Sequence, residues 1–216
     1  MKILLISPKT PDTFWSFKHV LRFVAKKAAF PPLGLLTVAA MLPREWKLKL
    51  VDLNVERLED ADLRWADHVL LSAMIVHQES VREVARRCAA LGRRVIAGGP
   101  LFTTGHEAFP EIPHFVLGEA EEIMPQLVAD LIAGTVRPLY RTAGFPDITR
   151  TPIPRYDLIK VRNYVTLAAQ FSRGCPYDCE FCDIIVMNGR VPRTKAPEQF
   201  VAELEALRRL GWKDMV

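Results

Sequence analysis

The heptapeptide RVIAGGP, residues 94–100, decides the fold of this chain. Its short apolar run, followed by two glycines and a proline, predicts a buried strand that ends in a tight turn. Runs of the same kind recur on both sides of it, and segments with helical spacing separate them. The predicted strands are 2–7, 47–52, 66–72, 94–97 and 114–117, and the predicted helices are 33–42, 78–91 and 119–132. This alternation predicts an α/β protein whose parallel five-stranded sheet is covered on both faces.

The chain downstream of residue 135 has a different pattern. Residues 136–163 contain four prolines and no clear periodicity, which predicts a linker packed on the surface. The run YVTLAAQF, residues 164–171, predicts a new strand, and residues 197–210 have the apolar spacing of a helix. Residues 212–216 resemble the approach to one more strand. We therefore expect a first domain over 1–135, a linker over 136–163, and over 164–216 the start of a βα barrel that is cut early.

Composition limits the class of protein. Half of the 216 residues are hydrophobic and a quarter are charged, which is the balance of a soluble globular chain. The formal charge of +4 comes without any run of five basic residues, so a nucleic-acid partner is not expected. The apolar stretch at the start is too short for a signal peptide, and the one at 33–42 is too short to span a bilayer. We expect a cytoplasmic protein with reduced thiols.

Three cysteines stand close together in the segment SRGCPYDCEFCD. Cys175, Cys179 and Cys182 lie within eight residues, so that their thiolates can converge on one metal centre. Iron–sulfur clusters are held by cysteine thiolates, and three ligands on a four-iron cluster leave one iron open. Structural zinc is the alternative, but it needs four ligands. No histidine follows His114, and Cys88 lies in a predicted helix as a buried structural thiol.

The segment RGCPYDCEFC resembles the CxxxCxxC motif of the radical S-adenosylmethionine superfamily. The resemblance implies that Cys175, Cys179 and Cys182 bind three irons of a [4Fe–4S] cluster and that S-adenosylmethionine chelates the fourth. Electron transfer from a donor such as flavodoxin or ferredoxin would then split S-adenosylmethionine to methionine and a 5′-deoxyadenosyl radical. Phe181 would lie near the adenine; the alternative is a core aromatic.

The first domain also carries a resemblance. A doubly wound sheet binds ligands at the carboxyl ends of its strands, which here carry Ser7, Asp52, Ser72 and the pair Gly98-Gly99. A unit of this size before the cysteine motif resembles the flavodoxin-like (Rossmann-like) cobalamin-binding domain, as does the turn VLGEAE at 116–121. The resemblance implies that Ser72, Gly98 and Gly99 line the nucleotide-tail side of cobalamin. Taken alone, the glycine pair is equally compatible with a plain turn. The DxHxxG motif is absent, so no histidine ligand to cobalt is expected.

A closer resemblance extends over most of the chain. The segments FWSFKHVLRFVAKKAAFPPLGLLTVAAMLP, AGGPLF and QFSRGCPYDCEFCDI resemble the group of hopanoid C-2 methylases and their relatives. It implies a methyltransferase that acts on an unactivated carbon of a small-molecule or lipid substrate. Two alternatives remain: a cobalamin-binding module without turnover, and a radical S-adenosylmethionine enzyme of another reaction type, such as a cyclase.

Two further features have open interpretations. His77 follows the third predicted strand, where it faces the corrin or the substrate, or is an ordinary polar residue before a helix. Residues 14–30 have the pattern of a basic amphipathic helix, which predicts peripheral membrane contact or, alternatively, a helix that caps the sheet edge. Its apolar face would carry Phe14, Phe17, Leu21, Val24 and Ala28, and its basic face Lys18, Arg22 and Lys26.

Overall fold

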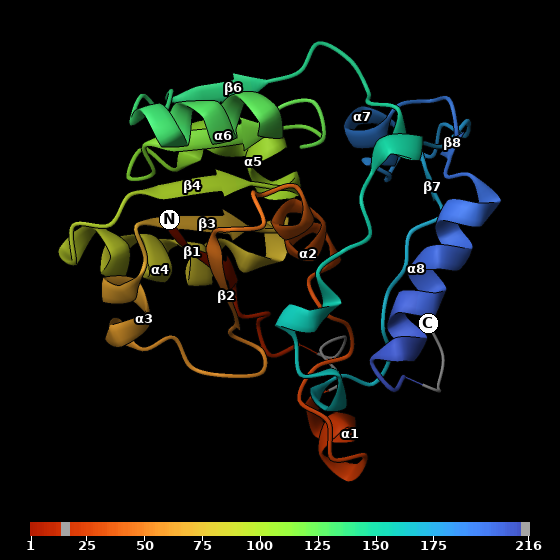
Figure 1. Cartoon of the computed structure of the whole chain (residues 1–216), viewed down its shortest axis with the longest axis horizontal. Coiled ribbons are helices and arrows are strands. Elements are labelled where there is room, and N and C mark those ends of the chain that lie inside the picture. The colour runs from red at the N-terminus through yellow and green to blue at the C-terminus, as the bar shows by residue number, and fades with distance from the viewer. Residues whose placement is uncertain (14–17, 213–216) are drawn as a thin grey trace.

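The computed structural model describes residues 1–13 and 18–212 and contains a parallel six-stranded sheet (Figure 1). The strand order is β2-β1-β3-β4-β5-β6, so the first five strands have the order 2-1-3-4-5 of the flavodoxin type. An antiparallel pair, β7 and β8, forms a second, small sheet. The predicted α/β class and flavodoxin-like arrangement are confirmed.

The elements of the sheet unit follow one another as strand and helix. They are β1 (Lys2–Ser7), α1 (Lys18–Phe23), α2 (Leu33–Ala40), β2 (Lys47–Asp52), α3 (Asp60–Trp65), β3 (His68–Ser72), α4 (Gln78–Ala90), β4 (Val95–Gly98), α5 (Pro100–Gly105), β5 (His114–Leu117), α6 (Met124–Ala133) and β6 (Leu139–Arg141). The remaining part of the chain contains β7 (Ser172–Arg173), α7 (Ile184–Asn188), β8 (Arg193–Thr194) and α8 (Pro197–Arg209). Short 3₁₀ turns lie at Ile75–His77, His106–Ala108, Ile148–Arg150, Tyr156–Leu158 and Val161–Asn163.

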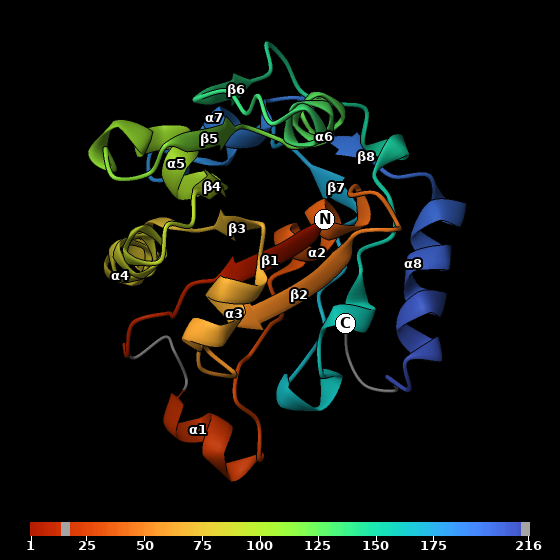
Figure 2. The same cartoon turned by 60° about the vertical axis from the view of Figure 1, so that its left-hand side comes forward.

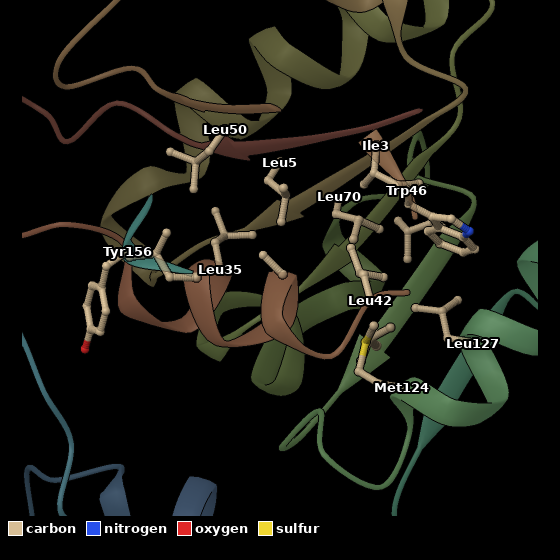
Figure 3. Packing of buried hydrophobic residues seen from close by; sticks show 14 of the residues in the cluster. Ile3, Leu5, Leu35, Leu42, Trp46, Leu50, Leu70, Met124, Leu127 and Tyr156 are labelled. Carbon is tan, nitrogen blue, oxygen red and sulfur yellow. The ribbon is translucent and has the colours of Figure 1, made fainter. Parts of the chain in front are cut away.

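The sheet separates two apolar layers. Successive side chains of a strand point to opposite faces, so Ile3 and Leu5 of β1 belong to one core cluster and Leu4 and Ile6 to the other. The first cluster packs against α2 and α6, and the second against α3, α4 and α5 (Figure 2). Figure 3 shows the first cluster, in which side chains of both sheet and helices meet: Ile3, Leu5, Leu35, Leu42, Trp46, Leu50, Leu70, Met124, Leu127 and Tyr156.

The sheet has six strands and not the five that we predicted. β6 pairs in parallel with β5 through Leu139, Tyr140 and Arg141, inside the segment expected to be a linker. Tyr140 anchors it, since this side chain is buried and its hydroxyl donates a 2.8 Å hydrogen bond to Asp130 of α6. Helix α6 begins at Met124, later than the predicted residue 119, so Glu119, Glu121 and Glu122 precede the helix and do not lie in its first turn.

The strand predicted at 164–171 is wrong. Tyr164 makes a single parallel bridge with Ala28, and regular strand structure begins only with β7. The apolar side chains of this run are nevertheless buried, because Tyr164 and Leu167 join the cluster on the α2 side of the sheet. The predicted helix at 197–210 is confirmed as α8, and its buried Leu207 belongs to the same cluster.

Residues 14–30 do not form one continuous amphipathic helix. Within the described residues helix α1 covers Lys18–Phe23, and Ala25 has a φ of +53°, which is incompatible with a helix that continues through it. Of the predicted apolar face, Leu21 and Ala28 are buried whereas Val24 is exposed. Phe14 and Phe17 lie outside the described residues, as does the strand expected after Trp212. No helix in the described parts of the chain is long and apolar enough to cross a membrane.

Candidate cofactor site at the carboxyl edge of the sheet

A cavity of about 610 Å³ lies where the strand order reverses. From β1 the chain moves outward to β2 and then returns past β1 to β3, which separates the loops that follow β1 and β3. Such a switch point is where open α/β sheets bind their ligands. Ser7, Asp52 and Ser72, at the ends of β1, β2 and β3, line the cavity, and residues 27–35 form its opposite wall. The volume is in the range of small-molecule and cofactor sites.

Asp52 is the buried acid of this cavity. One carboxylate oxygen accepts hydrogen bonds from the backbone and side-chain nitrogens of Asn54, at 3.0 and 2.8 Å. The other accepts a 3.0 Å bond from the hydroxyl of Tyr164. Burial raises the pKa of Asp52 above its ordinary value, although these bonds and the charge of His77 oppose the shift. The pKa of Tyr164 is raised in turn, chiefly by burial and then by Asp52, so its hydroxyl keeps its proton and donates.

His77 supports the loop that follows β3. Its Nδ1 accepts a 3.2 Å hydrogen bond from the backbone N–H of Met74, so Nε2 carries the proton and donates to Thr10 Oγ1 at 3.3 Å. Burial lowers the pKa of His77, which favours this neutral form. Both ring nitrogens are therefore engaged within the chain, while the ring still lines the cavity. Of the two interpretations, the structure favours an organiser of the loop before α4.

Ser72, Gly98 and Gly99 lie close together at the ends of β3 and β4. Ser72 and Gly98 are partners in the β3–β4 register, and Ser72 lines the cavity. Gly99 has a φ of +94°, and a Cβ placed there would lie 2.6 Å from Ser72 Oγ. Its carbonyl accepts a 3.1 Å hydrogen bond from Thr103 Oγ1, which itself accepts a bond from the N–H of Gly118. The residue that lies closest to Gly99 is thus Ser72 of the chain itself. Contact of Gly99 with a cofactor remains a prediction.

The cysteine loop lies between β7 and β8. The Cys175 and Cys182 side chains are half-buried and that of Cys179 is exposed, and none of them is in a disulfide. The backbone N–H of Cys175 donates to Gly189, and that of Cys182 to Cys179. Among the described side chains, no three histidine, cysteine or acidic groups converge as metal ligands. Three free, accessible thiols on one loop are nonetheless a donor set that fits a cluster with an open iron.

Two predictions on single aromatic and thiol side chains have clear outcomes. Phe181 is 91% exposed, so the alternative of a core aromatic is wrong, and its role near an adenine stays a prediction. Cys88 is fully buried in α4, and burial raises the pKa of its thiol to about 11. Cys88 is therefore the inert structural thiol that we predicted, chemically distinct from the three cysteines of the loop.

An ion-pair cluster connects the cysteine loop to the sheet, and sequence reasoning missed it. Glu119 and Glu121, directly after β5, bind Arg173 of β7 and Arg193 of β8. In Figure 1, β7, β8 and α7 lie on the side toward which the arrows of β4 and β6 point. The cavity and the cysteine loop are thus both at the carboxyl edge of one sheet. The sequence signal was the pair of glutamates in VLGEAE, opposite two arginines that flank the cysteines.

The sheet unit is similar to a known family of cofactor-binding domains. Residues 22–128 match the family described as the B12 binding domain. The relationship extends further along the chain: a hopanoid C-2 methylase of Rhodopseudomonas palustris is 36% identical to it, and an uncharacterized methyltransferase of Synechocystis sp. is 44% identical. The chain is thus similar to these methyltransferases over its whole length, and to the B12 binding domain over residues 22–128.

These alignments cover the whole of this chain but less than half of each relative. Both alignments include 100% of this chain but only 41% of the Synechocystis protein and 42% of the Rhodopseudomonas protein. The radical S-adenosylmethionine methyltransferase TsrM from Kitasatospora setae, solved with cobalamin and a [4Fe–4S] cluster, is 16% identical, with a TM-score of 0.64. That similarity covers 97% of this chain and 47% of TsrM, and it supports the fold.

Proposed function

We propose that this chain is the cofactor-binding part of a cobalamin-dependent radical S-adenosylmethionine methyltransferase. The observation that carries the proposal is the shared edge: the cavity at the switch point and the loop with Cys175, Cys179 and Cys182 both lie at the carboxyl ends of one sheet. A methyl donor in the cavity and a radical source on the loop would then face a common space. The domain match and the methyltransferase relatives support the same reading.

The chain's own residues have separate tasks in this proposal. The three loop thiolates would hold three irons of a [4Fe–4S] cluster, and Phe181, exposed beside Cys182, is available to cover an adenine. Ser72, together with the turn at Gly98 and Gly99, would line the cobalamin side. When bound, the cluster with S-adenosylmethionine supplies an organic radical and cobalamin supplies a methyl group.

The substrate and partners are proposed more broadly. One relative is named a hopanoid C-2 methylase, and on that basis methyl transfer to an unactivated carbon of a lipid, specifically a hopanoid, is the proposal for this chain. A lipid substrate is consistent with the exposed side chains of Val20, Phe23 and Val24, which offer apolar surface for peripheral contact with a membrane. An electron donor such as flavodoxin or ferredoxin would reduce the cluster.

Anaerobic reconstitution tests the cluster. The chain is incubated with iron and sulfide, desalted, and analysed for iron, zinc and low-temperature paramagnetic spectra with and without S-adenosylmethionine. We expect about four irons per chain, lost when Cys175, Cys179 and Cys182 become alanine, and retained in the matched control Cys88→Ala. A spectral change on adding S-adenosylmethionine would support the open iron. One zinc per chain, or iron that survives the triple substitution, would refute the assignment.

Cobalamin binding needs its own measurement. Hydroxocobalamin is added to the chain, and the cofactor that stays with the protein after gel filtration is quantified by its visible absorption. Ser72→Phe places a large ring in the cavity and should abolish retention, whereas Ala89→Phe, exposed on α4, should leave it unchanged. Equal retention by both folded variants would contradict binding at this cavity.

A further inference from the structure

Four charged side chains form a nearly closed cluster between the sheet unit and the cysteine loop. Glu119 and Glu121 follow β5, and Arg173 and Arg193 belong to β7 and β8. Their side chains are only 7, 9, 12 and 18% exposed, respectively. Charged groups are almost never buried to this degree unless they are paired. Here two positive and two negative charges balance, so the cluster is neutral as a whole.

The geometry of the cluster centres on Glu119. One carboxylate oxygen accepts from Arg173 at 2.6 Å and from Arg193 at 3.1 Å, and the second oxygen accepts another bond from Arg193. Arg173 also pairs with Glu121 at 2.7 Å. Bonds between ionised partners of this kind are stronger than neutral hydrogen bonds, and those of arginine are directional. One carboxylate thus fixes two guanidinium groups at once.

The two arginines hold both ends of the cysteine loop. Arg173 and Arg193 are register partners in the antiparallel pair of β7 and β8, and Arg173 precedes Cys175 by two residues. Arg193 extends the contact into the loop, because it also donates to the carbonyl of Asn188 at 3.0 Å. The two ends of the loop also come close together at Gly174, because a Cβ there would lie 2.5 Å from the carbonyl oxygen of Val191.

We propose that Glu119 is a positioning residue that fixes the cysteine loop on the carboxyl edge of the sheet through Arg173 and Arg193. This role deepens the proposed function and rests on it, because the distance between a cluster on the loop and a cofactor in the cavity would depend on this contact. Glu119 is not a ligand in this account. Glu119 holds the strand pair β7 and β8 against the turn after β5, and Arg173 of this pair lies 54 residues after Glu119.

Hydrogen–deuterium exchange of the chain without cofactors tests the proposal. Glu119→Gln keeps the size of the side chain but removes the charge, so exchange in residues 172–194 should rise at least about tenfold while β1 and β3 stay unchanged. Glu205→Gln is the matched control, since Glu205 forms an exposed ion pair with Arg209 at 3.2 Å. Unchanged exchange in 172–194 would overturn the proposal. Faster exchange throughout the chain would also overturn it, because Glu119 would then be an ordinary stabilising residue.

A distance measurement adds a readout that general stability does not move. Nitroxide labels are attached to Cys179 and to an introduced Ile75→Cys, both exposed, in a background where the other cysteines are serine or alanine. Pulsed dipolar spectroscopy should give a narrow distance distribution with Glu119 and a broad one with Glu119→Gln. An equally narrow distribution would refute the positioning role. Neither measurement uses iron or cobalamin, so failed reconstitution would count against the proposed function alone.

Discussion

Gly99→Ala tests whether the glycine pair serves the fold of the chain or only the approach of a cofactor. Gly99 has φ and ψ of 94° and −179°, a region that only glycine adopts readily. Holding another residue there costs about 1–3 kcal/mol. The new Cβ would also lie 2.6 Å from Ser72 Oγ and 3.0 Å from the carbonyl oxygen of Ala73. Overpacking of that kind costs a further 1–3 kcal/mol or so.

The expected loss of unfolding free energy is therefore about 2–6 kcal/mol. Domains of this kind have a total stability of about 5–15 kcal/mol, so the variant should still fold, with reduced stability. Urea unfolding followed by circular dichroism is the assay. With a slope of about 2 kcal/mol per molar urea, the midpoint should fall by about 1–3 M.

Gly92→Ala is the matched control, because Gly92 also has a positive φ, +66°, but no atom lies within 4 Å of the added Cβ. It should cost about 1–2 kcal/mol, from the backbone alone. A double variant of Gly99→Ala with Ser72→Ala should regain part of the loss, since the hydroxyl oxygen is the nearest of the three atoms that the added Cβ would meet. If Gly99→Ala is no more destabilising than Gly92→Ala, or loses cobalamin while keeping normal stability, the reasoning fails.

Three other substitutions or treatments test separate features. Iodoacetamide at pH 8 should modify the loop cysteines but leave Cys88 intact, because a thiol pKa of about 11 leaves about 0.1% thiolate; peptide mapping with equal labelling would contradict this. Burial lowers the pKa of His77 below its ordinary value of 6.5. As the pH falls through 6.5, the imidazole is therefore protonated in the unfolded state before it is protonated in the folded state, and the folded protein loses stability. The fall in the urea midpoint between pH 7.5 and 5.5 should be smaller in His77→Gln, while His68, also lowered by burial, contributes equally to both proteins; identical falls would exclude His77 as a source. Lys195→Met removes the partner of buried Glu203 and should cost about 3–5 kcal/mol; adding Glu203→Gln should restore most of it, and a double variant as unstable as the single one would argue against the pair.

The strands of the sheet were predictable where their apolar runs are long enough to stand out. Residues 114–117 match β5 at both ends, and the predicted 47–52 matches β2. Strand β6 was not predictable, because it has three residues and only its middle side chain is buried. Its connection is also unusual. The connection from β1 to β2 runs through α2, the connection from β5 to β6 runs through α6, and both helices cover the same face of the sheet. The two connections move in opposite directions along the strand order, so they have opposite hands.

The false strand at 164–171 shows why local pattern is insufficient. Short apolar runs do not distinguish a strand from any other buried segment, because burial and pairing are separate requirements. Leu167 is buried in a core cluster without a ladder partner beside it in the described residues. In the candidate site, the ends of the strands located Ser7, Asp52 and Ser72 correctly. The ion pairs of Glu119 depend on a contact across 54 and 74 residues, which no local pattern contains.

The hydrogen bond between Tyr164 and Asp52 has a consequence for the order of events during synthesis. The two residues are 112 positions apart. Since ribosomes add about 5–20 residues per second, Tyr164 is made about 6–22 s after Asp52. The last strand of the sheet, β6, ends at Arg141, which is made about 1–5 s before Tyr164. Microsecond to millisecond collapse of the sheet is much faster than that. During that interval the carboxylate of Asp52, which lines the cavity, lacks its hydrogen bond from Tyr164, so a ligand that enters then meets an acid with one more free acceptor than a ligand that arrives later.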